Sequence, residues 1–154
     1  MKLAPLINES VKFHDGDEIV IYREHRIPDT LPTEIAGSFN VFYSDITSLA
    51  GAPKKIGGSV TLTHNQNLDS LHDVHKHINH VGNMFNCSGA AIRSSVLGLM
   101  LIEIGGTITI QFENMEMYRN ANQILNKWKN QGRRGVLGAQ RELLDLGYDR
   151  LAQL

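Results

Sequence analysis

Short stretches in which apolar and polar residues alternate recur along the first two thirds of the chain. Four of them begin with an apolar and a small residue: IAGSFNV, IGGSVTL, VGNMFNC and IGGTITI, at residues 35–41, 56–62, 81–87 and 104–110. A weaker copy, DGDEIVI, covers residues 15–21. Alternation with a period of two predicts short strands, each with one face directed into a core.

The copies follow one another at similar intervals, and an apolar pair follows most strands. The steps between equivalent strand positions are 20, 21, 25 and 23 residues, and these positions are Ile19, Phe39, Val60, Phe85 and Ile108. The pairs are Ile27/Leu31, Ile46/Leu49, Leu68/Leu71 and Ile92/Val96. One such unit cannot bury its own apolar face, whereas stacked units bury a continuous core. Residues 15–112 are therefore expected to form an α/β repeat, a short solenoid of about five coils with a parallel sheet.

The last third of the chain has helical rather than alternating spacing. Residues 114–130 place five apolar residues near helical spacing, namely Met117, Ala121, Ile124, Leu125 and Trp128. The GRRG stretch at 132–135 is expected to interrupt this helix, and a second helix is expected from about residue 136 to a glycine stop at Gly147. Two helices over residues 113–154 would cap the open core edge of the last coil.

One copy carries a more specific pattern. Five of its positions approximate L-x-L-x-x-N-x-L-x-x-L with one additional residue before the fourth: Val60, Leu62, Asn65, Leu68 and Leu71. This pattern resembles a leucine-rich repeat. The SL.GAPK.IGG letters of residues 48–58 and the GRRGVLGAQRELLDLGYDRLAQL tail resemble short, degenerate leucine-rich-like proteins of tailed bacteriophages. The resemblance implies a protein-binding role and carries over no catalytic residues.

Length, charge and cysteine usage restrict the function further. A chain of 154 residues fits one domain, residues 1–154. Its 15 basic and 16 acidic residues give a net charge of −1, which is unlike the basic surface of a nucleic-acid-binding protein. A single cysteine permits no intramolecular disulfide and fits a reducing compartment. Without an apolar signal segment or a membrane-length apolar run, the sequence favours a cytoplasmic protein with no membrane contact.

Histidines are concentrated in HDVHKHINH, residues 72–80. Imidazole binds zinc and other transition metals, and the candidate ligands are His72, His75 and His80. His64 could approach them from the turn after the preceding strand. The alternative is a polar connector on the outer side of the solenoid, with its leucine, valine and isoleucine side chains pointing inward. Because histidines without an H-E-x-x-H or CxxC partner are weakly specific, no metal and no cofactor are predicted.

Motifs for other chemistry are not conspicuous. The glycine pairs 57–58 and 105–106 stand before strands, where glycine permits tight turns and close approach of the backbone, and neither belongs to a phosphate-binding motif. Cys87 occupies an inward strand position equivalent to Val41 and Leu62, so it is expected to be a small buried hydrophobe rather than a nucleophile. No catalytic residue is predicted.

The outward strand positions form the candidate contact surface. Period-two alternation places polar side chains next to two aromatic ones on the sheet face that leucine-rich repeats use for contacts. The candidate partner-binding residues are Tyr22, Asn40, Phe42, Thr61, Thr63, Asn86, Ser88, Thr109 and Gln111. The aromatic end is favoured, because aromatic residues dominate interface energetics.

The sequence thus predicts a non-enzymatic protein-binding module. The resemblance to phage proteins implies an accessory protein that acts in the host cytoplasm, where it would bind and modulate a host defence or replication protein. Two alternatives remain at this level: a virion or assembly component, and a metal-dependent enzyme built on the histidine cluster. A homo-oligomer is also an option, since solenoid ends and sheet edges invite pairing.

Overall fold

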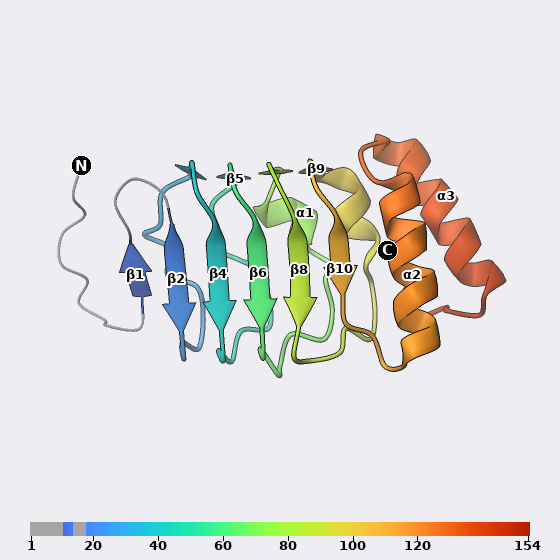
Figure 1. The fold of residues 1–154 in the computed structure, drawn as a ribbon, viewed down its shortest axis with the longest axis horizontal. Helices are drawn as coiled ribbons and strands as arrows, with labels where there is room; N and C mark the ends of the chain where they lie inside the picture. Colours follow the sequence, from blue (N-terminus) through green and yellow to red (C-terminus); the bar gives the residue numbers. More distant parts are fainter. Residues whose placement is uncertain (1–10, 14–17) are drawn as a thin grey trace.

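Five parallel strands lie side by side in chain order and form the larger of two sheets, sheet A (Figure 1). The computed structural model describes residues 11–13 and 18–154. The five strands are β2 (Ile19–Tyr22), β4 (Phe39–Phe42), β6 (Val60–Thr63), β8 (Phe85–Ser88) and β10 (Ile108–Ile110). Each predicted equivalent position pairs with the next one along the sheet, which confirms the register of the repeat. A further strand, β1 (Val11–Phe13), pairs with β2 in the antiparallel direction.

A second, smaller parallel sheet, sheet B, runs along the solenoid and was not predicted. Its strands have two residues each: β3 (Glu34–Ile35), β5 (Lys55–Ile56), β7 (His80–Val81) and β9 (Glu103–Ile104). Each turn of the chain passes through both sheets. The predicted α/β repeat solenoid is therefore confirmed, with about four turns in place of about five coils.

The core lies between the two sheets and the back of the solenoid. The inward strand residues are all at most 4% exposed: Ile19, Ile21, Phe39, Val41, Val60, Leu62, Phe85, Cys87, Ile108 and Ile110. The predicted apolar pairs after the strands are buried as well, apart from Leu31, which is partly buried against the core. The pattern of alternation thus identified the core correctly.

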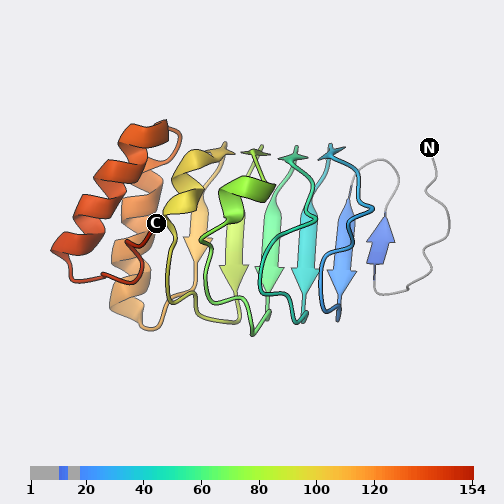
Figure 2. The same ribbon diagram turned by 180° about the vertical axis from the view of Figure 1, so that it is seen from behind.

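The uneven spacing of the repeats has a local cause. The chain forms the short helix α1 (Val74–His77) between β6 and β8, and a 3₁₀ helix, η1 (Leu97–Leu101), between β8 and β10. Both lie on the back of the solenoid, away from sheet A (Figure 2). These helical turns account for the longer steps of 25 and 23 residues.

Glycine is required where successive coils bend into sheet A. A Cβ atom on Gly57 would lie 2.4 Å from the carbonyl oxygen of Ala36 in the preceding coil. A Cβ on Gly82 would lie 2.1 Å from the Gly57 oxygen, and one on Gly105 would lie 2.2 Å from the Gly82 oxygen. The φ angles here are not left-handed, so close backbone approach explains these glycines.

Two helices close the C-terminal end of the solenoid, as predicted. They are α2 (Met115–Trp128) and α3 (Gly132–Asp145), and α2 lies between the sheets and α3 (Figure 1). Gly147, with φ of 80°, follows the helix end as predicted. The start of α3 was predicted wrongly, because GRRG forms its first turn rather than a break before it. Gly135 and Gly138 lie inside this helix, and a Cβ on Gly138 would lie 2.5 Å from the Trp128 ring.

Three asparagines, two in α2 and one just after it, join this part of the chain to the edges of both sheets. Asn126 accepts a hydrogen bond from the Ile108 nitrogen and donates one to the Ile108 oxygen, both at 2.8 Å. Asn122 makes the same two bonds with Ile110, also at 2.8 Å. Asn130 makes them with Ile104, at 2.8 and 2.7 Å. These side-chain amides take the place of a neighbouring strand. They form the hydrogen bonds that the exposed backbone nitrogens and oxygens of the last coil would otherwise lack.

Candidate functional site

The outward positions of sheet A form two rows across the strands. One row consists of Val20, Asn40, Thr61, Asn86 and Thr109, and the other of Tyr22, Phe42, Thr63 and Ser88. Gln111 follows the end of β10 and is exposed. None of the helices or strands that the structure describes lies over this face (Figure 1). The predicted candidate residues therefore share one surface.

The candidates differ in how much of each side chain is accessible. Tyr22 is 40% exposed, whereas Phe42 and the threonines are partly buried. Asn40 is only 9% exposed, and its amide donates to Glu18 Oε2 at 3.3 Å and to the Ile19 oxygen at 3.4 Å. Gln111 Oε1 accepts from the Gly89 nitrogen at 2.6 Å and supports the neighbouring turn. Asn40 and Gln111 thus make contacts within the fold, and the aromatic end is the more accessible part.

A ladder of left-handed residues lies at the carboxyl ends of the strands. Arg23, Tyr43 and His64 directly follow β2, β4 and β6 and have φ angles of 56°, 52° and 56°. Gly89 occupies the equivalent position after β8, with φ of 81°. Their backbone nitrogens donate to the next coil, as in the 3.0 Å bond from Tyr43 to the Thr63 oxygen. A left-handed conformation costs a residue with a side chain about 1 kcal/mol, so three in succession are unusual.

The side chains of this ladder stack on one another. The Tyr43 and His64 rings are parallel, with their centroids 4.8 Å apart, and Tyr22 meets Tyr43 edge-on at 5.9 Å. The Arg23 guanidinium lies 5.1 Å from the centre of the Tyr22 ring. On the other side of the stack, a Cβ on Gly89 would lie 2.6 Å from His64 Nδ1, so glycine leaves room for the imidazole. His64 therefore belongs to this stack.

We name Tyr22, Arg23, Phe42, Tyr43 and His64 the aromatic rim. Tyr43, which is 53% exposed, is its most accessible ring. The sequence predicted Tyr22 and Phe42 but missed the other three. By strict alternation Arg23, Tyr43 and His64 would point inward, and a change to the left-handed conformation directs them to the surface. The sequence signal was a polar or aromatic residue at an expected inward position in three successive copies.

Buried side chains hold the turns beneath the rim. Asn65, 3% exposed, accepts from the Ser44 nitrogen at 2.9 Å and donates to the Val41 oxygen at 3.0 Å. Ser44, 2% exposed, occupies the equivalent position one coil earlier and accepts from the Glu24 nitrogen at 3.0 Å. The asparagine of the leucine-rich-like pattern thus joins two coils, and a serine does the same in the coil before it. Satisfied buried polar groups of this kind rigidify the turns.

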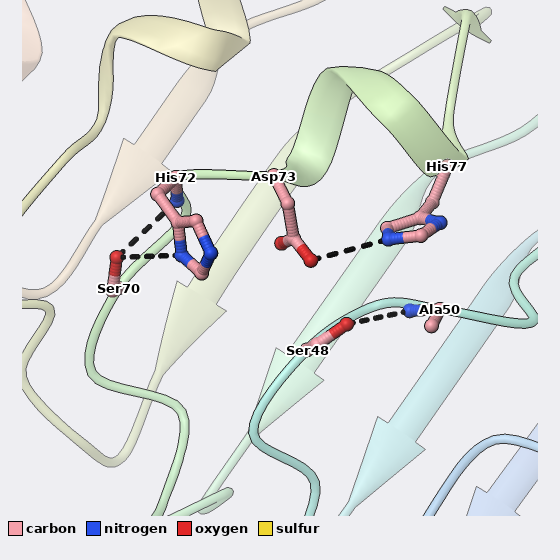
Figure 3. Close-up of polar contacts among 6 residues, drawn as sticks. All are labelled: Ser48, Ala50, Ser70, His72, Asp73 and His77. Carbon is pink, nitrogen blue, oxygen red and sulfur yellow. Dashed lines mark hydrogen bonds and ion pairs between the residues drawn. The ribbon is translucent and has the colours of Figure 1, made fainter. Parts of the chain in front are cut away.

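His72, His75 and His77 lie in or beside α1 on the back of the solenoid, and His72, His77 and His80 have separate partners. The His77 ring lies 3.2 Å from Asp73 Oδ2, and His72 Nδ1 lies 3.3 Å from Ser70 Oγ. Figure 3 shows that these two pairs are separate. The Ser48 hydroxyl on the neighbouring coil accepts from the Ala50 nitrogen at 2.9 Å. His80 lies in β7, not on a helix with His72, and its Nδ1 is 3.1 Å from Glu103 Oε1.

His75 is directed toward η1. Its Nδ1 is buried without a hydrogen-bond partner among the described residues, and a Cβ on Gly98 would lie 2.7 Å from it. Across residues 11–13 and 18–154, no three histidine, cysteine, aspartate or glutamate side chains are grouped in a way that could hold a metal ion. The structure thus does not bring His72, His75 and His80 together.

Cys87 lies in the core, at 4% exposure, and burial raises the pKa of its thiol to about 12. A thiol with such a pKa is almost fully protonated at neutral pH, and the thiolate is the nucleophilic form. This environment is that of a small hydrophobe.

The geometry defines a class of fold: a short α/β solenoid of two parallel sheets, closed by two helices. Comparison of the chain with protein-family models, curated proteins and solved structures finds no match. In the part of the chain that the structure describes, no helix has the length and apolar character needed to cross a membrane.

Proposed function

We propose that this protein is a non-enzymatic protein-binding module and that the aromatic rim is the centre of its contact surface. The observation that carries the proposal is the exposed, pre-ordered stack around Tyr43. Tyrosine and arginine are enriched among the residues that contribute most to binding energy at interfaces. The rim gathers two tyrosines, an arginine, a phenylalanine and a histidine on adjacent coils.

The left-handed backbone conformation of Arg23, Tyr43 and His64 costs free energy, which supports a role for these residues beyond folding. Left-handed residues with side chains persist where the surrounding structure fixes them, and they are concentrated at functional sites. The next coil has Gly89 at the equivalent position. Glycine adopts the left-handed conformation without the steric cost that a side chain adds, so the turn itself does not require a tyrosine or a histidine. Holding the rings in place before binding also lowers the entropy that association would otherwise lose.

The surroundings of the rim favour a protein partner over a single-stranded nucleic acid. Stacked rings and an arginine could also bind bases. However, Glu24 and Asp45 lie in the same turns, and Asp45 forms an ion pair with His25 at 3.2 Å. These carboxylates reduce the positive charge of the turns, and a phosphate backbone binds to positive charge. The threonine and asparagine rows beside the rim supply the polar border that protein interfaces have.

The phage resemblance of residues 48–58 and of the C-terminal tail leads us to a more specific proposal. The protein would be a bacteriophage accessory protein that acts in the host cytoplasm and modulates a host defence or replication protein. The leucine-rich-like positions from Val60 to Leu71 are consistent with this, since that class of repeat is used for protein contacts.

Affinity capture from bacterial lysate tests the proposal with the variant Tyr43→Gly. Glycine suits the left-handed backbone, so this change removes the ring while keeping the fold. We expect the wild-type protein to retain a specific protein, and Tyr43→Gly to retain about tenfold less of it, as for a central interface residue.

The matched control is Leu101→Ser, which removes a side chain of similar exposure, 49%, from the back of the solenoid. Circular dichroism confirms that both variants are folded. Equal recovery of the retained protein by wild type, Tyr43→Gly and Leu101→Ser would show that the rim is not the contact surface.

A further inference from the structure

The outward side of α3 carries arginines and leucines that the fold does not use. Five exposed residues form this α3 stripe: Arg133, Arg134, Leu137, Arg141 and Leu144. Leu137 and Leu144 are 57% and 49% exposed. Leu137, Arg141 and Leu144 are separated by four and three residues and therefore lie on one helix face. The other face of α3 packs into the cap through buried residues, namely Val136, Ala139 and Leu143.

The arginines of the stripe, Arg133, Arg134 and Arg141, form no ion pair in the part of the chain that the structure describes. The nearby Glu142 is already occupied, because Lys127 Nζ lies 2.9 Å from its carboxylate and the Trp128 ring nitrogen donates to it. The stripe is therefore a mainly positive surface with two apolar side chains, and the exposed Asp145 lies at its end, one turn after Arg141.

The first turn of α3 is unfavourable for the helix itself. The amino end of a helix is stabilised by negative charge, yet this turn has no acidic residue and contains Arg133 and Arg134. The preceding residue, Gln131, makes no side-chain capping bond. Helix stability thus does not explain these arginines, and a carboxylate from outside would be favourable both to them and to the helix end.

We propose that the α3 stripe is a second docking surface and binds an acidic amphipathic segment of a partner protein. Its apolar side chains would pack on Leu137 and Leu144, and its carboxylates would pair with the arginines, whose planar guanidinium groups suit them. Two leucines are a small apolar area for a membrane-surface helix, which buries a wide apolar face. A nucleic acid would place its charged backbone on the same leucines. The acidic, apolar protein segment fits both kinds of residue.

The stripe is separate from the aromatic rim. Figure 1 shows β2 and β4 toward one end of the solenoid and α3 at the other. The two surfaces can therefore be tested independently, and the loss of one does not imply the loss of the other.

Fluorescence anisotropy tests the proposal with a labelled helical peptide that presents leucine and glutamate on one face. We expect the full-length protein to bind this peptide, and Arg134→Glu/Arg141→Glu to raise Kd by about tenfold, as for the loss of two surface charge pairs. Leu137→Ser/Leu144→Ser should also weaken binding, and added salt should weaken the wild-type complex. A peptide with glutamine in place of glutamate should bind poorly.

Several results would overturn the proposal: no peptide binding by the wild type, equal binding by the charge-reversed variant, or equal binding of the glutamine peptide. The proposal would also be overturned if the protein did not bind the peptide and the arginines were needed for another interaction. That interaction could be binding to phosphatidylserine vesicles, binding to duplex DNA, or self-association measured by sedimentation. Circular dichroism checks that the variants are folded, and the single change Arg141→Gln gives a milder second test. Tyr43→Gly, at the other end of the molecule, should bind the peptide normally.

Discussion

At the residue scale, the same glycine position has different importance in different coils. Gly57, Gly82 and Gly105 each face the carbonyl oxygen of the coil before them, with no space for a Cβ. The equivalent residue in the first coil is Ala36, which is exposed. It directly follows β3, the strand at the edge of sheet B. No preceding strand of sheet B is described there, so a methyl group is tolerated. The difference between IAGS and IGGS in the sequence thus follows from the position of each coil in the stack.

This difference predicts unequal effects of exchanging alanine and glycine. Gly57→Ala should lower the free energy of unfolding by about 2 kcal/mol, because the methyl group forces the backbones of two coils apart. Ala36→Gly should cost less than about 1 kcal/mol, which reflects only added freedom of the unfolded chain. Urea unfolding curves of both variants give the comparison. Equal stability of Gly57→Ala and wild type would show that the coils are not packed as described.

The sequence predicted the direction of some side chains correctly and of others wrongly. Alternation identified the inward residues, because burial follows directly from a period of two. It did not predict that Arg23, Tyr43 and His64 leave this period. A polar or aromatic residue at an expected inward position was the signal, but it does not specify a left-handed φ as a glycine would. The histidine cluster was conspicuous in sequence, but its members lie before α1, within α1 and in β7, and have different surroundings.

At the element scale, α2 is shaped to meet a sheet edge. Asn122 and Asn126 are four residues apart and therefore lie on one face of the helix. Asn130 follows the helix end in a left-handed conformation, with φ of 64°, and makes the same pair of bonds to sheet B. Asparagine is not a good helix former. Its amide, however, has one acceptor and two donors and can imitate a backbone group. The edge of the last coil is thereby occupied, which leaves it unavailable for pairing with another chain.

The asparagine ladder predicts a specific loss of stability. Asn126→Ala removes the partners of the Ile108 nitrogen and oxygen, and each lost hydrogen bond is worth about 1 kcal/mol. We expect the free energy of unfolding to fall by about 2 kcal/mol. Gln123→Ala, at an exposed position of the same helix, is the control and should change it by less than about 0.5 kcal/mol. Equal effects of the two changes would show that the amide contacts do not hold the cap.

The helices could be predicted from apolar spacing, but their boundary could not. GRRG suggested a break, because two glycines in a helix normally destabilise it. In the folded protein the chain breaks earlier, after Trp128, and α3 begins at Gly132. Gly138 is retained inside the helix because the Trp128 ring occupies the space that a side chain would need. This reason is a tertiary contact, so no local pattern could reveal it.

At the scale of the whole molecule, the solenoid separates three surfaces. Sheet A presents the aromatic rim and the polar rows, the back carries α1 and η1, and the C-terminal end carries the α3 stripe (Figures 1 and 2). Repetition explains why the architecture could be predicted from one sequence, since every coil repeats the same evidence for buried and exposed positions. The two-residue strands of sheet B were missed, because they are too short to show any alternation.

Site-specific photo-crosslinking tests the central claim, binding through the aromatic rim, most directly. A photoreactive phenylalanine analogue replaces Tyr43 in one variant and Leu101, on the back of the solenoid, in another, and each is irradiated in bacterial lysate. We predict that position 43 forms a crosslink with one defined protein and that position 101 does not. Crosslinks to a defined protein from position 101 alone, or from neither position, would contradict the account.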